Sequence, residues 1–324
     1  MISKGLIVQN SRQFGTLIGL IVVTIVFWIL SPYFLTVSNL MNIAEQTSIN
    51  AIIAVGMTFV IITAGIDLSV GSIVAVSGVV LAGVLHSGIP EPLAILVGLG
   101  IGSLCGLING LLISYGRLPA FIATLGMMSV ARGAALFYTE GRPISGFSPE
   151  LRFLATGELA RIPAPVIIMV ALYVAAHFVL KRTKLGRYAY AIGGNEEAAN
   201  LSGINTKIVK TAIYGVCGLF SGLAAVILTA RLNSAQPIAG MMYELDAIAA
   251  VVIGGTSLMG GEGKITGTLI GAFIMGILRN GLNLLGLSSF TQQIVIGSVI
   301  ILAVLAEMAL RKDTKLMQGK GIIS

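Results

Sequence analysis

The residues of this chain best suited to chemistry are a few acids, amides and hydroxyls set beside or between apolar segments. Asp67 lies between two apolar runs, where an acid either caps the helix that starts near Leu68 or lines a polar pathway. Amides and hydroxyls can bind a neutral polyol, since they offer both donors and acceptors of hydrogen bonds. Pairing between helices is the alternative for each amide. The pattern predicts a substrate pathway with six candidate residues: Asp67, Ser69, Asn50, Asn109, Asn280 and Asn283.

A second polar stretch, Gly193–Gly203, stands alone among apolar segments and predicts a short helix over 195–202. Asn195 is a good N-cap, Glu196 and Glu197 suit the positive end of the helix dipole, and Gly203 can take the left-handed conformation that ends a helix. A helix this short is marginal in water unless something packs on it. We therefore expect a docking surface, made of Gly193, Gly194, Asn195, Glu196, Glu197, Ala198, Ala199 and Gly203.

Residue types that support catalysis are sparse. His86 and His177 are far apart in the sequence, so neither a histidine-based triad nor a metal site is expected. The run 260–264 resembles a phosphate-binding loop, but that pattern requires glycine where Leu258 stands and serine or threonine where Ile265 stands. The chain is thus predicted to be no enzyme, to hold no cofactor, and to have no nucleotide-hydrolysing site of its own.

The elements that position these residues are transmembrane helices. The chain has 324 residues, of which 56% are hydrophobic and 10% charged, and its mean hydropathy is +0.97. Such a composition indicates a polytopic membrane protein. We predict an all-α fold, one domain over 1–324, with about ten spans. The apolar segments are 15–34, 49–65, 70–86, 93–115, 119–139, 165–180, 211–230, 247–259, 266–286 and 291–309.

Two places in this pattern leave alternatives open. Segment 247–259 is too short to span, so its helix either starts nearer Tyr243 or is broken or re-entrant, as 65–71 could also be. The runs 64–71 and 253–261 resemble each other weakly, and each precedes a span striped with glycine. In one span, glycines recur every four residues from Gly98 to Gly110. This spacing favours close helix packing over a binding role.

The basic residues indicate the orientation. With the N-terminus inside and ten crossings, fourteen of the twenty lysines and arginines lie on the cytoplasmic side, four on the opposite side and two within spans. Because cytoplasmic loops are enriched in Lys and Arg, both termini and the loop 181–210 are expected in the cytoplasm. The loop 140–164 is then external, either a connector or a surface for a soluble partner. Topology also explains the net charge of +7, so no nucleic-acid partner is expected.

Several motifs, met in order along the chain, resemble the permease subunits of bacterial monosaccharide ABC importers. These are Thr63–Ser72, Leu185–Tyr188, Gly193–Asn195 and Ala249–Ser257. A further set is similar to the ribose-importing members of that family: Phe121–Leu125, Ser234–Pro237, Tyr243–Ile248 and Asn280–Gly286. Glu197-Ala198-Ala199 with Gly203 matches the short pattern by which importer permeases contact their ATPase, although 213–216 lacks the Leu-Pro pair of the longer pattern.

This resemblance implies an assembly in the bacterial inner membrane. Two permease copies, expected as a homodimer among membrane lipids, would receive a monosaccharide from a periplasmic sugar-binding protein. A separate sugar-type ATPase would drive import through the loop 181–210. Ribose is the first substrate that the resemblance implies, with xylose, galactose or an inositol as alternatives. A branched-chain amino-acid permease and an ion-coupled secondary transporter are the remaining alternatives.

Overall fold

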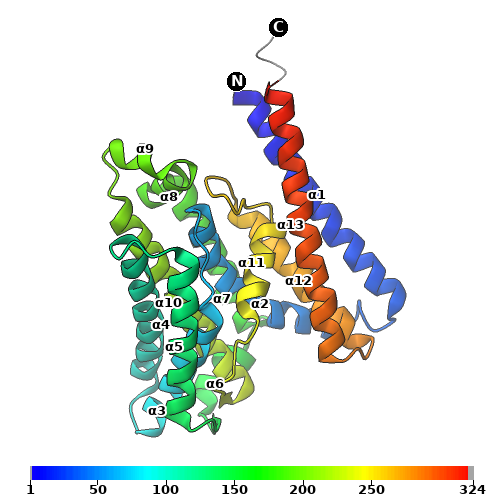
Figure 1. The fold of residues 1–324 in the computed structure, drawn as a ribbon. Helices are drawn as coiled ribbons and strands as arrows, with labels where there is room; N and C mark the ends of the chain where they lie inside the picture. The colour runs from blue at the N-terminus through cyan, green and yellow to red at the C-terminus, as the bar shows by residue number, and fades with distance from the viewer. Residues whose placement is uncertain (1, 320–324) are drawn as a thin grey trace.

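The apolar segments form helices that run back and forth between two ends of a bundle (Figure 1). The computed structural model describes residues 2–319, and the side-chain surroundings of residues 15–305. Within them the helices are α1 (Ile2–Leu30), α2 (Val37–Ile62), α3 (Val70–His86), α4 (Glu91–Ser114), α5 (Ala120–Thr139), α6 (Pro149–Thr156), α7 (Ala164–Arg182), α8 (Lys184–Gly194), α9 (Glu196–Leu201), α10 (Thr206–Leu232), α11 (Tyr243–Ile253), α12 (Ile265–Leu284) and α13 (Ser289–Gly319).

The two ends of the bundle differ in what they carry. Helices α8 and α9 lie at the same end as the start of α1 and the close of α13, which we call the terminal end (Figure 1). The opposite, α6 end carries α6 and short antiparallel strand pairs. Strand β1 (Ile144–Ser145) pairs with β4 (Ser234–Ala235), and β2 (Glu158–Leu159) pairs with β3 (Ile162–Pro163). The loop 140–164 is therefore an ordered surface segment.

Ten helices correspond one by one to the ten predicted segments, and the all-α prediction is confirmed. In the described part of the chain, six helices are long and apolar enough to cross a membrane, and three shorter apolar helical stretches accompany them. Proline directly precedes α4, α5 and α7, at Pro90, Pro119 and Pro163. Its fixed φ and missing N–H suit the start of a helix.

Helix α2 differs from its predicted extent, because it begins at Val37 rather than at residue 49. Thr36 caps it by accepting a hydrogen bond from the Asn39 backbone N–H at 3.3 Å. The polar residues Glu45 and Asn50, which interrupt the apolar run, lie within the helix. At the preceding connection, α1 ends at Leu30 instead of continuing to residue 34.

The short segment near residue 250 is a broken span. Helix α11 starts at Tyr243, as one of the two alternatives proposed. Its 11 residues are only about 16 Å long, whereas the hydrocarbon core of a membrane is about 30 Å thick. The non-helical stretch 236–242 precedes it and the connection 254–264 follows it. Helix α11 itself packs against α2, α3, α12 and α13.

Glycines set the closest contact in the bundle, between α4 and α10. A Cβ added at Gly102 would overlap the Gly218 carbonyl oxygen, and one added at Gly106 would overlap the Tyr214 carbonyl oxygen. At Gly110 it would press on the Thr211 backbone. The four-residue glycine stripe is thus a packing surface, as its spacing favours.

Candidate functional site

Helices α8 and α9 form an elbow, residues 184–201, that projects at the terminal end between α7 and α10 (Figure 1). Thr183 caps α8, because its hydroxyl accepts a hydrogen bond from the Gly186 N–H at 3.4 Å. Asn195 then ends α8 and begins α9, and its Oδ1 accepts the Ala198 N–H at 2.9 Å. The predicted cap at Asn195 is confirmed, whereas the paired glycines before it prove to be the last turn of α8.

The other end of α9 closes with a Schellman motif. Gly203 has φ +84, and its N–H donates to the Asn200 carbonyl at 3.0 Å. The Ile204 N–H reaches back to the Ala199 carbonyl at 3.1 Å. This pair of bonds is the pattern that a left-handed glycine permits. The predicted stop at Gly203 is therefore also confirmed.

The outer face of α9 offers a small surface to a partner. Ala199 is buried against the bundle, but Leu201 is 83% exposed and Glu197 and Ala198 are exposed beside it. Six residues cannot hold a helix in water by propensity alone, so the caps and the buried Ala199 hold it in place. The exposed side chains of Leu201, Glu196 and Glu197 thus form a small surface suited to docking on a capped helix.

Behind the elbow lies a cavity of about 640 Å³. It is bounded by the end of α2, the α4–α5 connection, the elbow and the first turns of α10. Thr63, Ser114 and Tyr214 give it hydroxyl groups, and the cations Arg117, Lys207 and Lys210 line it with the acid Glu196. The lining thus mixes apolar and polar groups, and its charged side chains carry a net positive charge.

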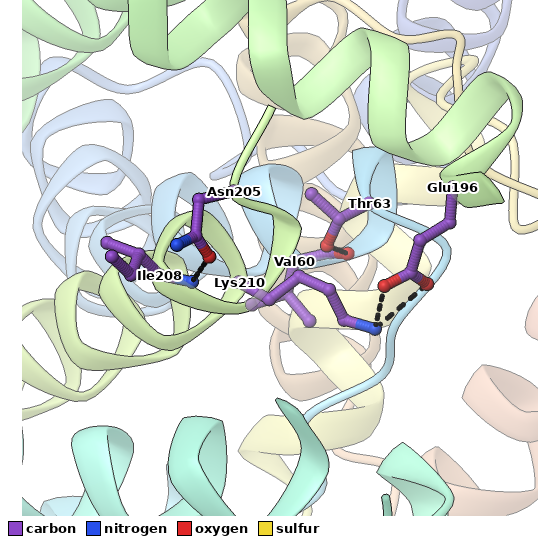
Figure 2. Close-up of polar contacts among 6 residues, drawn as sticks. All are labelled: Val60, Thr63, Glu196, Asn205, Ile208 and Lys210. Atoms are coloured by element: carbon purple, nitrogen blue, oxygen red, sulfur yellow. Dashed lines mark hydrogen bonds and ion pairs between the residues drawn. The ribbon is translucent and has the colours of Figure 1, made fainter. Parts of the chain in front are cut away.

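Two of the residues that line this cavity, Glu196 and Lys210, form an ion pair (Figure 2). The Lys210 ammonium of α10 lies 3.0 Å from both carboxylate oxygens of Glu196 in α9. The first turn of α10 is capped by Asn205, whose Oδ1 accepts the Ile208 N–H at 3.2 Å. Surface pairs of this kind add little stability, and this one connects the first turn of α9 to α10.

Three of the six predicted pathway residues form one buried group, the Asp67 cluster. The Asp67 carboxylate accepts the Ser69 N–H at 2.9 Å and the Ser69 hydroxyl at 2.5 Å. The Asn109 side-chain amide of α4 donates to that hydroxyl at 2.8 Å. All three side chains are fully buried. Of the two alternatives for Asp67, the one that makes it the N-cap of a helix starting near Leu68 is wrong, because α3 begins at Val70 and Ser69 is its N-cap residue.

The other predicted pathway residues lie apart from this cluster. Asn50 donates to the buried Asp246 carboxylate at 3.2 Å, and Arg279 donates to the same oxygen at 2.6 Å. Asn280 exchanges two amide hydrogen bonds with Asn39, at 2.9 and 3.0 Å. Asn283 is exposed near the end of α12. Within the described structure Asn50 and Asn280 each join two helices, and the six residues do not form one continuous line.

The comparisons with known proteins agree with this architecture. A family profile described as "Branched-chain amino acid transport system / permease component" matches residues 39–304. The chain belongs to this permease family. The matched residues run from α2 into α13 and include the elbow, its cavity and the Asp67 cluster.

Individual relatives cover nearly the whole chain. The ribose import permease protein of Escherichia coli strain K12 is 51% identical over 296 residues, 90% of this chain and 92% of the relative. That of Bacillus subtilis strain 168 is 53% identical over 298 residues, 91% and 92% of the two chains. The D-allose transport system permease protein of E. coli K12 is 39% identical over 302 residues, 93% of each. No solved structure matches the chain.

Several residues of the site escaped prediction from the sequence. Helix α8 was one omission, although Thr183 is a cap residue and Leu185, Ala189 and Ile192 have helical spacing on one face. The Glu196–Lys210 pair was another, because its partners lie 14 residues apart across a turn. The Asp246–Arg279 pair had no local signal, since the two side chains come from different helices.

Proposed function

We propose that this chain is the transmembrane permease subunit of an ATP-driven monosaccharide importer, with ribose as the first substrate. The observation that supports the proposal is the identity of 51–53%, over nine-tenths of the chain, to proteins named as ribose import permeases. Relatives named for D-allose and xylose are less similar, at 39% and 35%. The family description mentions branched-chain amino acids, but an amphoteric substrate favours charged contacts, whereas five of the six candidate pathway residues carry an amide or a hydroxyl group.

The partners follow from the chemistry of the chain. No P-loop is present in the sequence, so a separate ATPase has to supply the energy. The elbow is the surface on which it docks, with the terminal end in the cytoplasm. This orientation agrees with the excess of Lys and Arg on that side. A second copy of the permease completes the pathway in the inner membrane, and a periplasmic binding protein delivers sugar to the α6 end.

In this mechanism, ATP binding closes the ATPase and displaces the elbow as a unit. The displacement switches the pathway between outward-facing and inward-facing states. Docking alone cannot drive the switch, since a partner shifts an equilibrium only by its differential affinity for the two states. Asp67 and Ser69 lie in the connection between α2 and α3, and Asn109 lies in α4. Because these side chains are buried in the described structure, the switch between states has to expose them before they can meet the passing sugar.

The substrate is tested by uptake of radiolabelled ribose in a strain that lacks this chain, with and without a plasmid that restores it. Restored uptake, with unlabelled ribose competing better than xylose, allose or galactose, is the expected result. Unchanged ribose uptake in the deleted strain would remove ribose as the substrate. Uptake by proteoliposomes that contain this chain alone, driven by a proton gradient, would favour an ion-coupled carrier instead.

The docking role is tested by the double variant Glu197→Lys, Gly203→Pro. It should reach the membrane in normal amount but lose both sugar uptake and co-purification of the ATPase. Normal uptake would refute the docking role.

The pathway role of Asp67 is tested by Asp67→Asn. The new side chain retains an oxygen that can accept hydrogen bonds from Ser69 but carries no charge. Loss of transport would therefore indicate a charge-dependent step, and full transport would indicate a structural role.

A further inference from the structure

Three backbone segments meet behind the elbow without a side chain between them. The Gly261 N–H donates to the Ile62 carbonyl at 2.9 Å, which joins the loop 254–264 to the last residue of α2. Gly193 of α8 lies on top of this bond, because a Cβ there would overlap both the Ile62 oxygen and the Gly261 nitrogen. A Cβ at Gly260 would lie 3.0 Å from the Gly193 Cα. We call Ile62, Gly193, Gly260 and Gly261 the glycine junction.

The junction can be built only from glycine at its key positions. Gly260 and Gly261 have φ +80 and +72, conformations in which residues with a Cβ are strained. Gly193 has no room for a Cβ. A second contact ties the same parts together, since the Tyr190 hydroxyl of α8 donates to the Gly263 carbonyl at 2.8 Å. Burial raises the pKa of the Tyr190 phenol, so this donor keeps its proton.

The segments that meet at the junction lead into the broken parts of the bundle. Five residues after Ile62 comes Asp67, and the connection between them passes Gly65, whose backbone lies against the Tyr214 hydroxyl. The loop 254–264 connects the broken span α11 to α12. These are the two runs, 64–71 and 253–261, that resemble each other in sequence. They touch directly, because a Cβ at Gly260 would lie 2.8 Å from the Ala64 Cβ.

We propose that the glycine junction transmits the displacement of the elbow to both irregular connections at once, and that Gly193 and Tyr190 are its positioning residues. This inference rests on the proposed docking of an ATPase on the elbow. Packed interiors respond to a push by shifting between discrete arrangements rather than by deforming smoothly. Backbone in direct contact with backbone leaves no side-chain rotamer to absorb the movement. The α2–α3 and α11–α12 connections therefore move together with α8.

The test compares Gly193→Ala with Gly100→Ala, using the full complex of permease, ATPase and sugar-binding protein in proteoliposomes. Gly100 is an exposed glycine of α4 where an added Cβ meets nothing within 4 Å. The measurements are ATPase co-purification, ATP hydrolysis, and sugar molecules imported per ATP hydrolysed. Gly193 packs inward against Ile62 and Gly261 rather than lying on the outer face of α9 that we propose for docking. We therefore expect Gly193→Ala to keep the ATPase bound and hydrolysing while sugar per ATP falls about tenfold, within the range of mutations along coupling networks. Gly100→Ala should match the wild type.

A normal ratio of sugar to ATP in Gly193→Ala would overturn the inference. If that variant does not accumulate in the membrane, Tyr190→Phe provides the same test, since it removes one hydrogen bond and keeps the ring. Its ratio should fall by about fivefold, and an unchanged ratio there would also overturn the inference. The docking role fails separately, if Glu197→Lys leaves ATPase binding and uptake intact.

Discussion

Helix α9 provides a direct test of how a six-residue helix is held, because its two caps can be removed independently. Asn195→Ala removes the acceptor of the Ala198 N–H, and loss of such a cap costs about 1 kcal/mol. Gly203→Ala places a residue with a Cβ at φ +84, which costs about 1 to 2 kcal/mol. The two sites lie at opposite ends of the helix, so the costs should add. Together they raise the local opening equilibrium by about 30- to 150-fold.

The assay is native-state hydrogen exchange of purified protein in detergent, followed by mass spectrometry of peptides that cover 196–204. Amides opened by local unfolding exchange in proportion to the opening equilibrium. Asn200→Ala is the matched control, because Asn200 is exposed in the same helix and alanine is a better helix former than asparagine. It should leave exchange unchanged or slow it. Exchange in the double variant within about twofold of wild type would show that the packing of Ala199, not the caps, stabilises α9.

Three further predictions concern the interior. Arg279→Met removes the cation at 2.6 Å from the buried Asp246 carboxylate and leaves it only the Asn50 amide, so the free energy of unfolding in detergent should fall by about 3 kcal/mol. Adding Asp246→Asn should restore most of this stability, and an Arg279→Met variant as stable as the wild type would contradict the prediction. Thr58→Val leaves the buried Thr268 hydroxyl without its partner at 2.8 Å and should lower the free energy of unfolding by about 1 kcal/mol. In a double-mutant cycle, adding Thr268→Val should recover part of this loss. Strictly additive losses in the double variant would argue against an interaction between the two hydroxyls. Gly218→Leu should separate α4 from α10 and prevent accumulation in the membrane on immunoblots, and normal accumulation would refute that contact.

The spans and the caps of α9 could be predicted because their signals are local. The length of an apolar run indicates a transmembrane helix. The cap residues Asn195 and Gly203 form hydrogen bonds with residues only three positions away. The start of α2 was missed for a related reason. Its first half carries the polar residues Asn39 and Glu45, which lower the local hydropathy, yet it is helical, and the Asn39 amide is paired with Asn280 of α12. A hydropathy window cannot see that partner.

The polar contacts could not be predicted, since their partners are remote in sequence. Asn39 and Asn280 are 241 residues apart. From the sequence alone, either amide could contact a substrate as well as another helix. The glycine junction is similar. The sequence shows Gly193, Gly260 and Gly261, but a need for close backbone approach appears only when α8 is placed against the loop 254–264.

The glycine contact between α4 and α10 has a consequence for how the protein is made. Helix α4 ends at Ser114 and α10 ends at Leu232, so roughly a hundred residues are synthesised between them. At about 5–20 residues per second, α4 waits about 6 to 24 s for its partner. During that interval the glycines that meet α10, which are Gly102, Gly106 and Gly110, lack the helix that covers them in the folded bundle. The contact between α4 and α10 thus forms late in biosynthesis. A ribosome that stalls after synthesising α4 but before α10 would leave this contact unformed.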